Sequence, residues 1–359
     1  MSIHFHPVRI REVRRETASC VSLLLDIPPA LQSSFRYNHG QSLTVRSIIN
    51  GEEVRRTYSL CSSPLDNEWR IAVKRVDGGL FSNLANDSLR AGDSIEVMEP
   101  IGRFYTDLDA ANQKKYLAIA AGSGITPILS IIKTTLATEP KSHFTLVYGN
   151  RSRQDIIFLE ELEGLKNRYL NRLQLLHILS REQVDSPILQ GRIDENKLNE
   201  LTRVISFSEM NEAFLCGPES LIFSAKAFLE KSGLEGNQIH FELFTTPGQQ
   251  TKSVNTAERT VQVAAASKVQ IRLDGRSMEF EIPEGSEQTV LDAALAFGAD
   301  LPYACKGGVC CTCKAKLVEG EVSMDVQWGL DEEEIKKGYI LTCQSHPKTD
   351  RVLVDFDDR

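Results

Sequence analysis

Five of the eight cysteines in this 359-residue sequence lie in its last quarter, and four of them have the spacing of a metal centre. These four are Cys305, Cys310, Cys313 and Cys343, and the first three form Cys-x4-Cys-x2-Cys. The same spacing is typical of a plant-type 2Fe–2S cluster, in which one loop supplies three thiolates and a separate segment the fourth. Structural zinc usually takes two Cys-x2-Cys pairs, and this loop holds only one. The spacing therefore predicts an iron–sulfur cluster, with zinc as the alternative.

The loop around these cysteines contains Gly307 and Gly308, which leave room for backbone N–H groups to approach the cluster sulfurs. The fifth cysteine, Cys311, directly follows a ligand. It is therefore expected to point away from the irons and to behave as a small hydrophobic residue.

A second motif, Arg56-Thr57-Tyr58-Ser59-Leu60, combines a cation, an aromatic ring and a hydroxyl group. Alternate side chains of a strand share a face, so Arg56 and Tyr58 should project together. A guanidinium group suits a phosphate and a flat ring suits an aromatic cofactor, and Ser59 offers a hydrogen bond to a ring nitrogen. The motif indicates a flavin, although an ordinary strand can carry the same residues.

A glycine-containing turn, Gly78-Gly79-Leu80-Phe81-Ser82-Asn83, follows a predicted strand and opens a short helical run to residue 89. Glycines before a helix N-terminus allow close approach of the backbone, and the helix dipole favours a diphosphate. A simple turn capped by Ser82 is the alternative.

Together, these two motifs resemble those of the ferredoxin–NADP reductase superfamily, and the resemblance extends from the start of the chain to about residue 244. It implies that FAD is the flavin. It also implies that Arg56, Tyr58 and Ser59 hold the flavin, and that Gly78, Gly79 and Ser82 hold its diphosphate.

Two further motifs indicate a nicotinamide coenzyme. In Ala121-Gly122-Ser123-Gly124-Ile125-Thr126-Pro127, Gly122 and Gly124 suit a tight turn and Pro127 is tolerated in the first helical turn. The stretch departs from the generic Gly-x-Gly-x-x-Gly, but it resembles the Gly-x-Gly-x-x-Pro of the same superfamily. Cys216-Gly217-Pro218 resembles the second nicotinamide motif of that superfamily. Ile239-His240-Phe241-Glu242 resembles its last strand, which implies that His240 and Glu242 lie near the flavin; an ordinary alternating strand is the alternative. The resemblance places Ser59, Thr126 and Cys216 beside the hydride-transfer site without acid–base roles; a buried core thiol is the alternative for Cys216.

The ends of the next two strands bear on which coenzyme binds. An acidic residue at the end of the second strand is typical of NAD binding, and Tyr148-Gly149-Asn150-Arg151-Ser152-Arg153 has none. The third strand ends in Ser180-Arg181. Arg151, Arg153, Ser180 and Arg181 are therefore candidate ligands of a 2′-phosphate, and NADPH is expected rather than NADH. Solvated surface arginines are the alternative.

Strand and helix patterns place these motifs in a multidomain chain. The first part predicts an antiparallel flavin-binding β-barrel with a hairpin at Asn50-Gly51. The middle part alternates strands with helices, which is typical of an α/β parallel-sheet nucleotide-binding domain. The last part, with a hairpin at Asp274-Gly275, resembles plant-type ferredoxins, which implies an α+β β-grasp domain.

Strands are predicted over residues 20–27, 41–49, 70–76, 94–98, 116–120, 144–148, 173–179, 213–215, 238–244, 269–273, 278–282 and 351–356. Helices are predicted over 154–169, 219–231 and 289–297, with a helical turn over 331–337. The predicted domains are an FAD-binding barrel (1–110), an NAD(P)-binding domain (111–247), a linker (248–267) and a 2Fe–2S ferredoxin domain (268–359).

Composition excludes several classes of protein. The net charge of -8 argues against nucleic acid or an anionic membrane as the main partner. No signal-peptide or membrane-spanning run is present, so a cytoplasmic location is expected. Residues 268–359 carry eleven basic and eighteen acidic residues, a net charge of -7. Within them, Glu332, Glu333 and Glu334 suggest either a docking face for a basic partner or a solvated surface.

The predicted function is electron transfer from NADPH through FAD to a 2Fe–2S cluster and on to an oxygenase protein. The domain order and residues 338–347 resemble most the reductase subunits of phenylacetyl-CoA epoxidase complexes. Reductases of Rieske or ketosteroid oxygenases share the layout and are the alternative. A flavin/iron–sulfur redox sensor or carrier is an alternative from another class.

Overall fold

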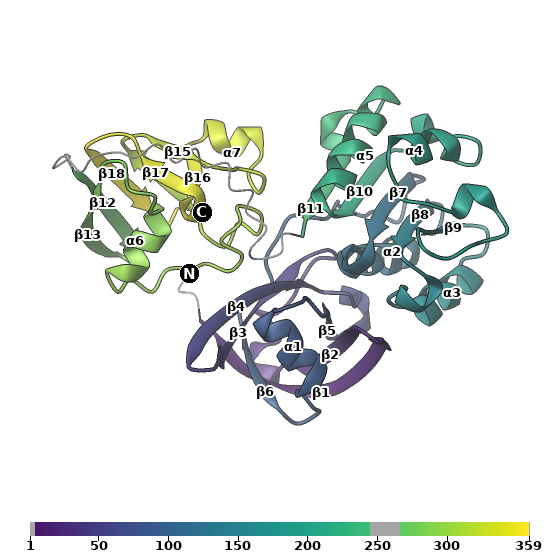
Figure 1. The fold of residues 1–359 in the computed structure, drawn as a ribbon, viewed down its shortest axis with the longest axis horizontal. Coiled ribbons are helices and arrows are strands. Elements are labelled where there is room, and N and C mark those ends of the chain that lie inside the picture. Colours follow the sequence, from purple (N-terminus) through teal and green to yellow (C-terminus); the bar gives the residue numbers. More distant parts are fainter. Residues whose placement is uncertain (1–3, 245–265, 359) are drawn as a thin grey trace. The chain divides into compact units, whose positions relative to one another are not determined.

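The computed structural model describes residues 4–244 and 266–358, and the chain divides into two compact units (Figure 1). The first unit is Phe5–Phe244, and the second contains residues 266–358. Most of the predicted linker lies outside the described residues. Its last two residues, Ala266 and Ser267, already belong to a strand.

The N-terminal half of the first unit is an antiparallel sheet in the order β4-β3-β6-β1-β2-β5. A bridge between Leu60 and Ile71 joins its two outer strands, which makes the sheet a barrel as predicted. At the predicted hairpin, Asn50 and Gly51 have φ of 55° and 83°, values that suit the tight turn between β3 and β4. The elements are β1 (His6–Thr17), β2 (Cys20–Asp26), β3 (Ser42–Ile49), β4 (Glu52–Ser59), β5 (Trp69–Lys74), α1 (Leu80–Asp87) and β6 (Ser94–Val97), with 3-10 turns Pro29–Leu31 and Pro64–Asp66.

Strand β1 has no counterpart among the predicted strands. Its Val8 and Ile10 are buried in the barrel core, whereas Arg9 and Arg11 are exposed. Buried apolar and exposed polar residues therefore alternate in this strand, but its many arginines make the segment look polar when only its composition is considered.

The second half of the first unit is a parallel sheet in the order β11-β10-β7-β8-β9. Helix α2 packs against β7, β8 and β10, and α5 packs against β10 and β11. The strands are β7 (Lys115–Ala121), β8 (His143–Asn150), β9 (Leu173–Leu179), β10 (Glu212–Gly217) and β11 (Ile239–Leu243). The helices are α2 (Ile125–Thr138), α3 (Leu159–Arg168), α4 (Glu195–Leu201) and α5 (Glu219–Lys231), with 3-10 turns Gly122–Gly124, Arg153–Asp155, Pro187–Leu189, Phe207–Glu209 and Gly236–Gln238.

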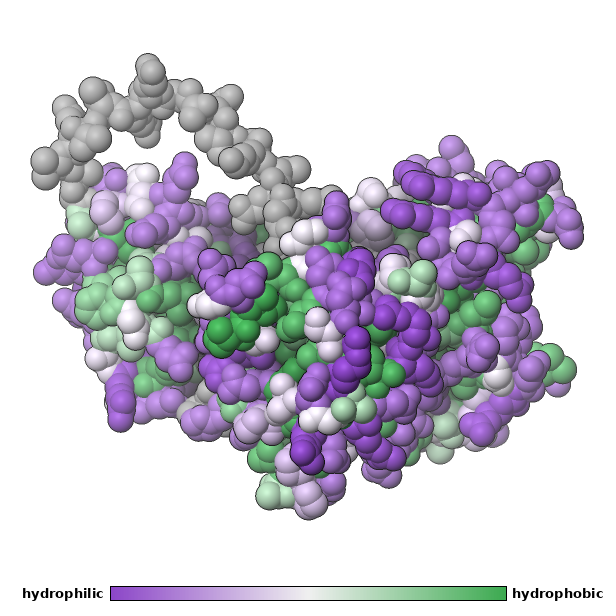
Figure 2. Space-filling model, turned by 60° about the horizontal axis from the view of Figure 1, so that its bottom comes forward, coloured by the Kyte–Doolittle hydropathy of each residue, from purple (hydrophilic) through white to green (hydrophobic). Residues whose placement is uncertain are grey.

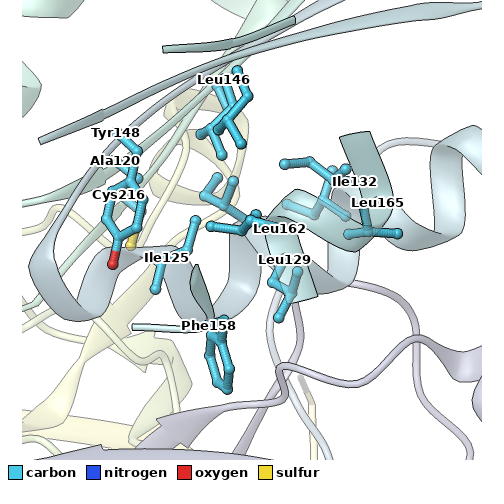
Figure 3. Close-up of a cluster of buried hydrophobic side chains, with 14 of the residues drawn as sticks. Ala120, Ile125, Leu129, Ile132, Leu146, Tyr148, Phe158, Leu162, Leu165 and Cys216 are labelled. Carbon is cyan, nitrogen blue, oxygen red and sulfur yellow. The ribbon is translucent and has the colours of Figure 1, made fainter. Parts of the chain in front are cut away.

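The helix predicted over 154–169 starts later than expected. Phe158 has a left-handed backbone with φ of 62°, which ends the preceding turn and lets α3 begin at Leu159. Phe158 is buried in the same apolar cluster as Leu162 and Leu165 of α3 (Figure 3). Burial of this large side chain offsets the cost of its unfavourable backbone.

Barrel and nucleotide domain are held together through α2. Ser130 Oγ donates to the carbonyl oxygen of Ser62 at 2.6 Å, and the hydroxyl groups of Ser63 and Thr134 lie 2.8 Å apart. One apolar cluster includes residues from both domains. The two domains therefore share a packed interface on which groups from each can meet.

The C-terminal unit is a mixed sheet in the order β13-β12-β18-β14-β16, with a two-stranded sheet, β15-β17. Strands β12 and β18 are parallel, and α6 packs against β13, as expected for a β-grasp domain. At the predicted hairpin, Asp274 and Gly275 have φ of 51° and 70°. The elements are β12 (Ala266–Leu273), β13 (Arg276–Pro283), α6 (Val290–Ala296), β14 (Lys314–Glu319), β15 (Val322–Met324), α7 (Glu332–Lys336), β16 (Tyr339–Leu341), a 3-10 turn Thr342–Gln344, β17 (Ser345–Pro347) and β18 (Arg351–Asp355).

Hydrophilic residues cover much of the face drawn in Figure 2, with hydrophobic residues interspersed among them. Among residues 4–244 and 266–358, none of the helices has the length and apolar composition required to span a bilayer.

Candidate functional site

The end of β4 carries the first flavin motif. Arg56 and Tyr58 pair with Val45 and Leu43 of β3, so both side chains lie on the face that alternation predicts. Both are half-buried. The Tyr58 ring lies 5.5 Å from the ring of Phe81, at the start of α1. The two flavin motifs, separated by some twenty residues in sequence, are therefore in contact.

The turn before α1 is shaped by the hydroxyl group of Ser82. The backbone N–H of Val76 donates to Ser82 Oγ at 3.1 Å, and Oγ donates to the Gly79 carbonyl oxygen at 3.2 Å. Gly78 is left-handed, with φ of 69°. Helix α1 has no side-chain cap, so the N–H groups of its first turn are open to an anion. Ser82 thus holds the turn, and the backbone offers the contacts to a diphosphate.

Ser59, at the end of β4, reaches across to the nucleotide domain. Its Oγ donates to Glu242 Oε2 at 3.0 Å, and Glu242 pairs in register with Cys216 on the neighbouring strand. Burial raises the pKa of the Glu242 carboxyl to about 7, although the hydrogen bond from Ser59 opposes this. Burial also raises the pKa of the Cys216 thiol, and the nearby Glu242 carboxylate adds to the effect. A hydroxyl, a carboxyl and a thiol from three strands are therefore brought together.

The resemblance of the last parallel strand to that of the superfamily implies that His240 and Glu242 lie near the flavin, with an ordinary alternating strand as the alternative. Nothing else in the sequence distinguishes Glu242 from a surface carboxylate. In the structure, Glu242 lies beside Ser59, whereas His240 Nε2 lies 2.7 Å from Glu212 Oε2.

The turn after β7 approaches the same place. A Cβ atom on Gly124 would lie 2.1 Å from the Cys216 carbonyl oxygen, so only glycine fits there. Gly122 is left-handed, with φ of 54°. Thr126 Oγ1 donates to the Ser123 carbonyl oxygen at 3.1 Å, which closes the first turn of α2. Gly124 is thus required by packing between two strand ends, and it lies in the tight turn that the sequence predicts.

The second nicotinamide motif packs against the first. A Cβ atom on Gly217 would lie 3.3 Å from the backbone nitrogen of Ala121, and Pro218 precedes the first residue of α5. Pro127 lies in the first turn of α2, as predicted. Cys216 pairs with Ala120 of β7 and is buried in the apolar cluster drawn in Figure 3. The structure therefore brings Gly122, Gly124, Thr126, Pro127, Cys216, Gly217 and Pro218 to one edge of the sheet.

The candidate 2′-phosphate site lies at the ends of β8 and β9. The N–H of Arg181 donates to the Arg151 carbonyl oxygen at 2.8 Å, and the N–H of Ser180 donates to the Asn150 carbonyl oxygen at 3.0 Å. Arg151, Arg153 and Arg181 are exposed, and within the described part of the chain their guanidinium groups form no ion pair. The edge also carries an acid that sequence analysis missed: Glu182 Oε2 accepts a hydrogen bond from the Arg153 N–H at 2.6 Å.

The four predicted cluster ligands lie in two pairs of neighbouring thiols. The Cys310 side chain lowers the pKa of Cys305 to about 6, and the Cys313 side chain lowers the pKa of Cys343. Each pair can therefore present a thiolate, the form that binds metal. In the described residues, no three His, Cys, Asp or Glu side chains gather around a point that could hold a single ion.

The loop is built to fold around these thiols. The Gly307 N–H donates to Cys305 Sγ at 3.3 Å, and Thr312 Oγ1 lies 3.2 Å from Cys310 Sγ. Gly308 has φ of 71°, and a Cβ atom there would lie 2.5 Å from the side chain of Val326. Donors to sulfur and a glycine without room for a side chain fit a 2Fe–2S cluster in this loop.

Cys311 belongs to neither pair of cysteines. Its thiol donates to the Gly329 carbonyl oxygen at 2.6 Å. The Cys311 thiol therefore contacts Gly329, which lies outside the cysteine loop, as expected for a residue that does not bind iron.

The acidic run before Cys343 is divided by the fold. Glu332 and Glu333 are exposed, with 91% and 81% of their side chains accessible, and each lies near a lysine of the same segment. Glu334 is buried and pairs with Lys314 at 2.8 Å. The prediction of a face formed by all three glutamates is therefore wrong for Glu334, because its carboxylate is turned inward to the lysine.

Three family models match consecutive parts of the chain. They are the oxidoreductase FAD-binding domain (residues 8–105), the oxidoreductase NAD-binding domain (118–227) and the 2Fe-2S iron-sulfur cluster binding domain (271–348). Fold and site thus define a reductase that carries its own iron–sulfur domain.

Related proteins match this chain over almost its whole length. The chain is 46% identical to one of the subunits of 1,2-phenylacetyl-CoA epoxidase from Escherichia coli (strain K12), over 98% of each chain. It is 34% identical to the ferredoxin reductase component of 3-ketosteroid-9-alpha-monooxygenase from Rhodococcus rhodochrous, over 97% of this chain and 95% of that one. The solved structure of phthalate dioxygenase reductase shares the fold, with a TM-score of 0.57, 24% identity and 98% coverage of both chains. The chain belongs to the family that includes the first two proteins.

These matches confirm the predicted fold class, the FAD, nicotinamide and 2Fe–2S domains, and a flavin/iron–sulfur oxidoreductase that uses NAD(P)H. The predicted domain boundaries, the roles of individual residues and the choice between NADPH and NADH stay predictions.

Proposed function

We propose that this chain takes electrons from NADPH and passes them through FAD and a 2Fe–2S cluster to the di-iron component of a phenylacetyl-CoA epoxidase. The observation that carries the proposal is 46% identity to a subunit of that epoxidase over 98% of both chains. When bound, FAD accepts two electrons as hydride and releases them singly, and the cluster carries one at a time. The cytoplasmic location expected from the sequence is part of the proposal, since thiols that bind iron must stay reduced.

In the proposed flavin site, Arg56 and the open N–H groups of α1 bind the diphosphate, and the half-buried ring of Tyr58 supports the flavin ring. Gly78, Gly79 and Ser82 give this turn its shape. Ser59 supplies the hydroxyl beside the reacting ring nitrogen. Its hydrogen bond to Glu242, at 3.0 Å, orients that hydroxyl and provides a carboxyl that can hold a proton near neutral pH.

In the proposed coenzyme site, Gly122, Gly124, Gly217 and Pro218 form the edge against which the dinucleotide lies. Thr126 and Cys216 lie beside the nicotinamide. The burial of the Cys216 thiol and the rise in its pKa keep it neutral, so it would serve as a packing surface. Arg151, Arg153, Ser180 and Arg181 would bind the 2′-phosphate, because three exposed cations lie at adjacent strand ends.

In the proposed cluster site, Cys305 and Cys310 would bind one iron, and Cys313 and Cys343 would bind the other. The thiol contacts within each pair support this division. Three of the four ligands lie on one loop, and the 3-10 turn after β16 brings in the fourth.

The experiment that tests the partner is a coupled turnover assay. The purified chain is added to a phenylacetyl-CoA epoxidase preparation that lacks its own reductase, and it should restore NADPH-dependent epoxidation. Support for a 3-ketosteroid or glycine betaine monooxygenase instead would favour the second candidate, which rests on 34% and 32% identity to their reductases. Failure to reduce cytochrome c steadily with NADPH would argue for a sensor or carrier.

A further inference from the structure

A buried glutamine beside the fourth cysteine has a side chain that the proposed function does not use. Gln344 follows Cys343 in the 3-10 turn, and only 6% of its surface is exposed. A primary amide loses its hydrogen bonds to water on burial, which is costly unless protein groups replace them. Its partners therefore show what the side chain does.

The amide nitrogen of Gln344 reaches three acceptors. Nε2 lies 2.9 Å from the carbonyl oxygens of Lys306 and Cys343 and 3.6 Å from Cys343 Sγ, within the longer range of a bond to sulfur, so its two N–H groups are shared among these three acceptors. Lys306 lies in the cysteine loop, 38 residues earlier. One side chain thus connects the loop that holds three cysteines with the segment that holds the fourth.

The loop at this contact has an unfavourable backbone. Lys306 is left-handed, with φ of 51°, which is uncommon for a residue with a side chain. Two residues on, a Cβ atom at Gly308 would lie 3.0 Å from Cγ of Gln344. The Cγ methylene of Gln344 therefore packs against the loop, and its amide group holds the carbonyl oxygen of Lys306.

The backbone of Gln344 is also held, because its carbonyl oxygen accepts the N–H of Asp325 at 2.9 Å. Since the backbone is anchored and the side chain is buried, the amide has little freedom to turn away from Cys343.

We propose that Gln344 is a positioning residue that holds Cys343 against the cysteine loop and raises the reduction potential of the cluster by directing an N–H group at the Cys343 sulfur. The inference rests on the proposed function, in which these cysteines bind the cluster. Reduction adds one electron, supplied by the flavin, and no bond to the protein changes. The added negative charge is shared by the ligand sulfurs, and a donor to one of them favours the reduced state.

Two variants of the full chain test this role. Gln344→Met keeps the length of the side chain and removes the donor, and Gln344→Glu keeps its shape and replaces the donor with oxygen. The cluster potential is measured by a redox titration followed by EPR, and the flavin potential is read from its visible absorption in the same samples. Gln288→Met, at an exposed glutamine of the same domain, is the matched control.

Both Gln344 variants should keep two irons per chain and show a more negative cluster potential, with the larger shift in Gln344→Glu. The flavin potential should not move, and Gln288→Met should match the wild type. Unchanged cluster potentials in both variants with intact clusters would overturn the inference. Loss of the cluster in both would overturn the role of Gln344 in setting the potential and would leave only its role in holding Cys343 against the loop. A wild-type chain without any cluster would overturn the proposed function itself.

Discussion

Replacing Glu242 by glutamine should make the first unit more stable at alkaline pH. The carboxyl of Glu242 accepts a hydrogen bond from Ser59 at 3.0 Å, and the side-chain carbonyl of glutamine can accept the same bond. The substitution therefore removes the ionisable group while it preserves the shape and the contact.

The magnitude follows from the pKa. Burial raises the pKa of Glu242 from 4.5 to about 7, so the folded chain holds this proton more tightly than the unfolded chain does. A pKa difference of roughly 2.5 corresponds to about 3 kcal/mol, as an upper bound. Because the pKa is raised in the folded state, ionisation of Glu242 lowers the free energy of unfolding of the wild type. This effect is absent below pH 4.5, grows as the pH rises from 4.5 to 7, and is complete above pH 7.

The assay is urea unfolding of the flavin-free chain at several pH values between 4.5 and 8. The chain has two tryptophans, so a Trp328→Phe background leaves Trp69 of the barrel as the fluorescent reporter. The stability difference between Glu242→Gln and the parent should be smallest near pH 4.5 and grow by up to about 3 kcal/mol by pH 8. Glu160→Gln, at an exposed position, should show no such growth. A difference that does not change with pH would refute the buried-carboxyl reasoning.

Three further results are expected. Cys343→Ser should abolish reduction of cytochrome c but spare reduction of ferricyanide by NADPH, which can draw on the flavin; equal loss of both would contradict independent domains. Arg151→Ala and Arg181→Ala should each raise KM for NADPH about 10- to 100-fold with little effect on KM for NADH, since a charge-assisted phosphate contact contributes about 1.5–3 kcal/mol. A wild type that prefers NADH would rule out the 2′-phosphate site. Coupled turnover with the oxygenase should slow as the salt concentration rises, and the double variant Glu332→Gln, Glu333→Gln should depend less on salt. A wild-type rate that does not change with salt would mean that both glutamates are only part of a solvated surface.

Local features of the sequence determined a large part of this protein. The spacing of Cys305, Cys310 and Cys313 predicts a cluster loop because a short loop can converge on irons only at certain intervals. The hairpins at Asn50-Gly51 and Asp274-Gly275 were predictable because few residues tolerate the positive φ that these turns require. Alternation of strands and helices was enough to predict the parallel sheet.

Other features depend on contacts between distant segments. Ser59 and Glu242 are 183 residues apart and meet only because the barrel packs against the nucleotide domain. No periodicity distinguishes Glu242 from a surface carboxylate, and none distinguishes the buried Glu334 from the exposed Glu333. The pairing of Cys313 with Cys343 and the reach of Gln344 to the cysteine loop likewise follow from the β-grasp fold. Sequence spacing specifies which chemical groups are available, but their burial and their partners depend on packing between segments, and these set pKa values and hydrogen bonds.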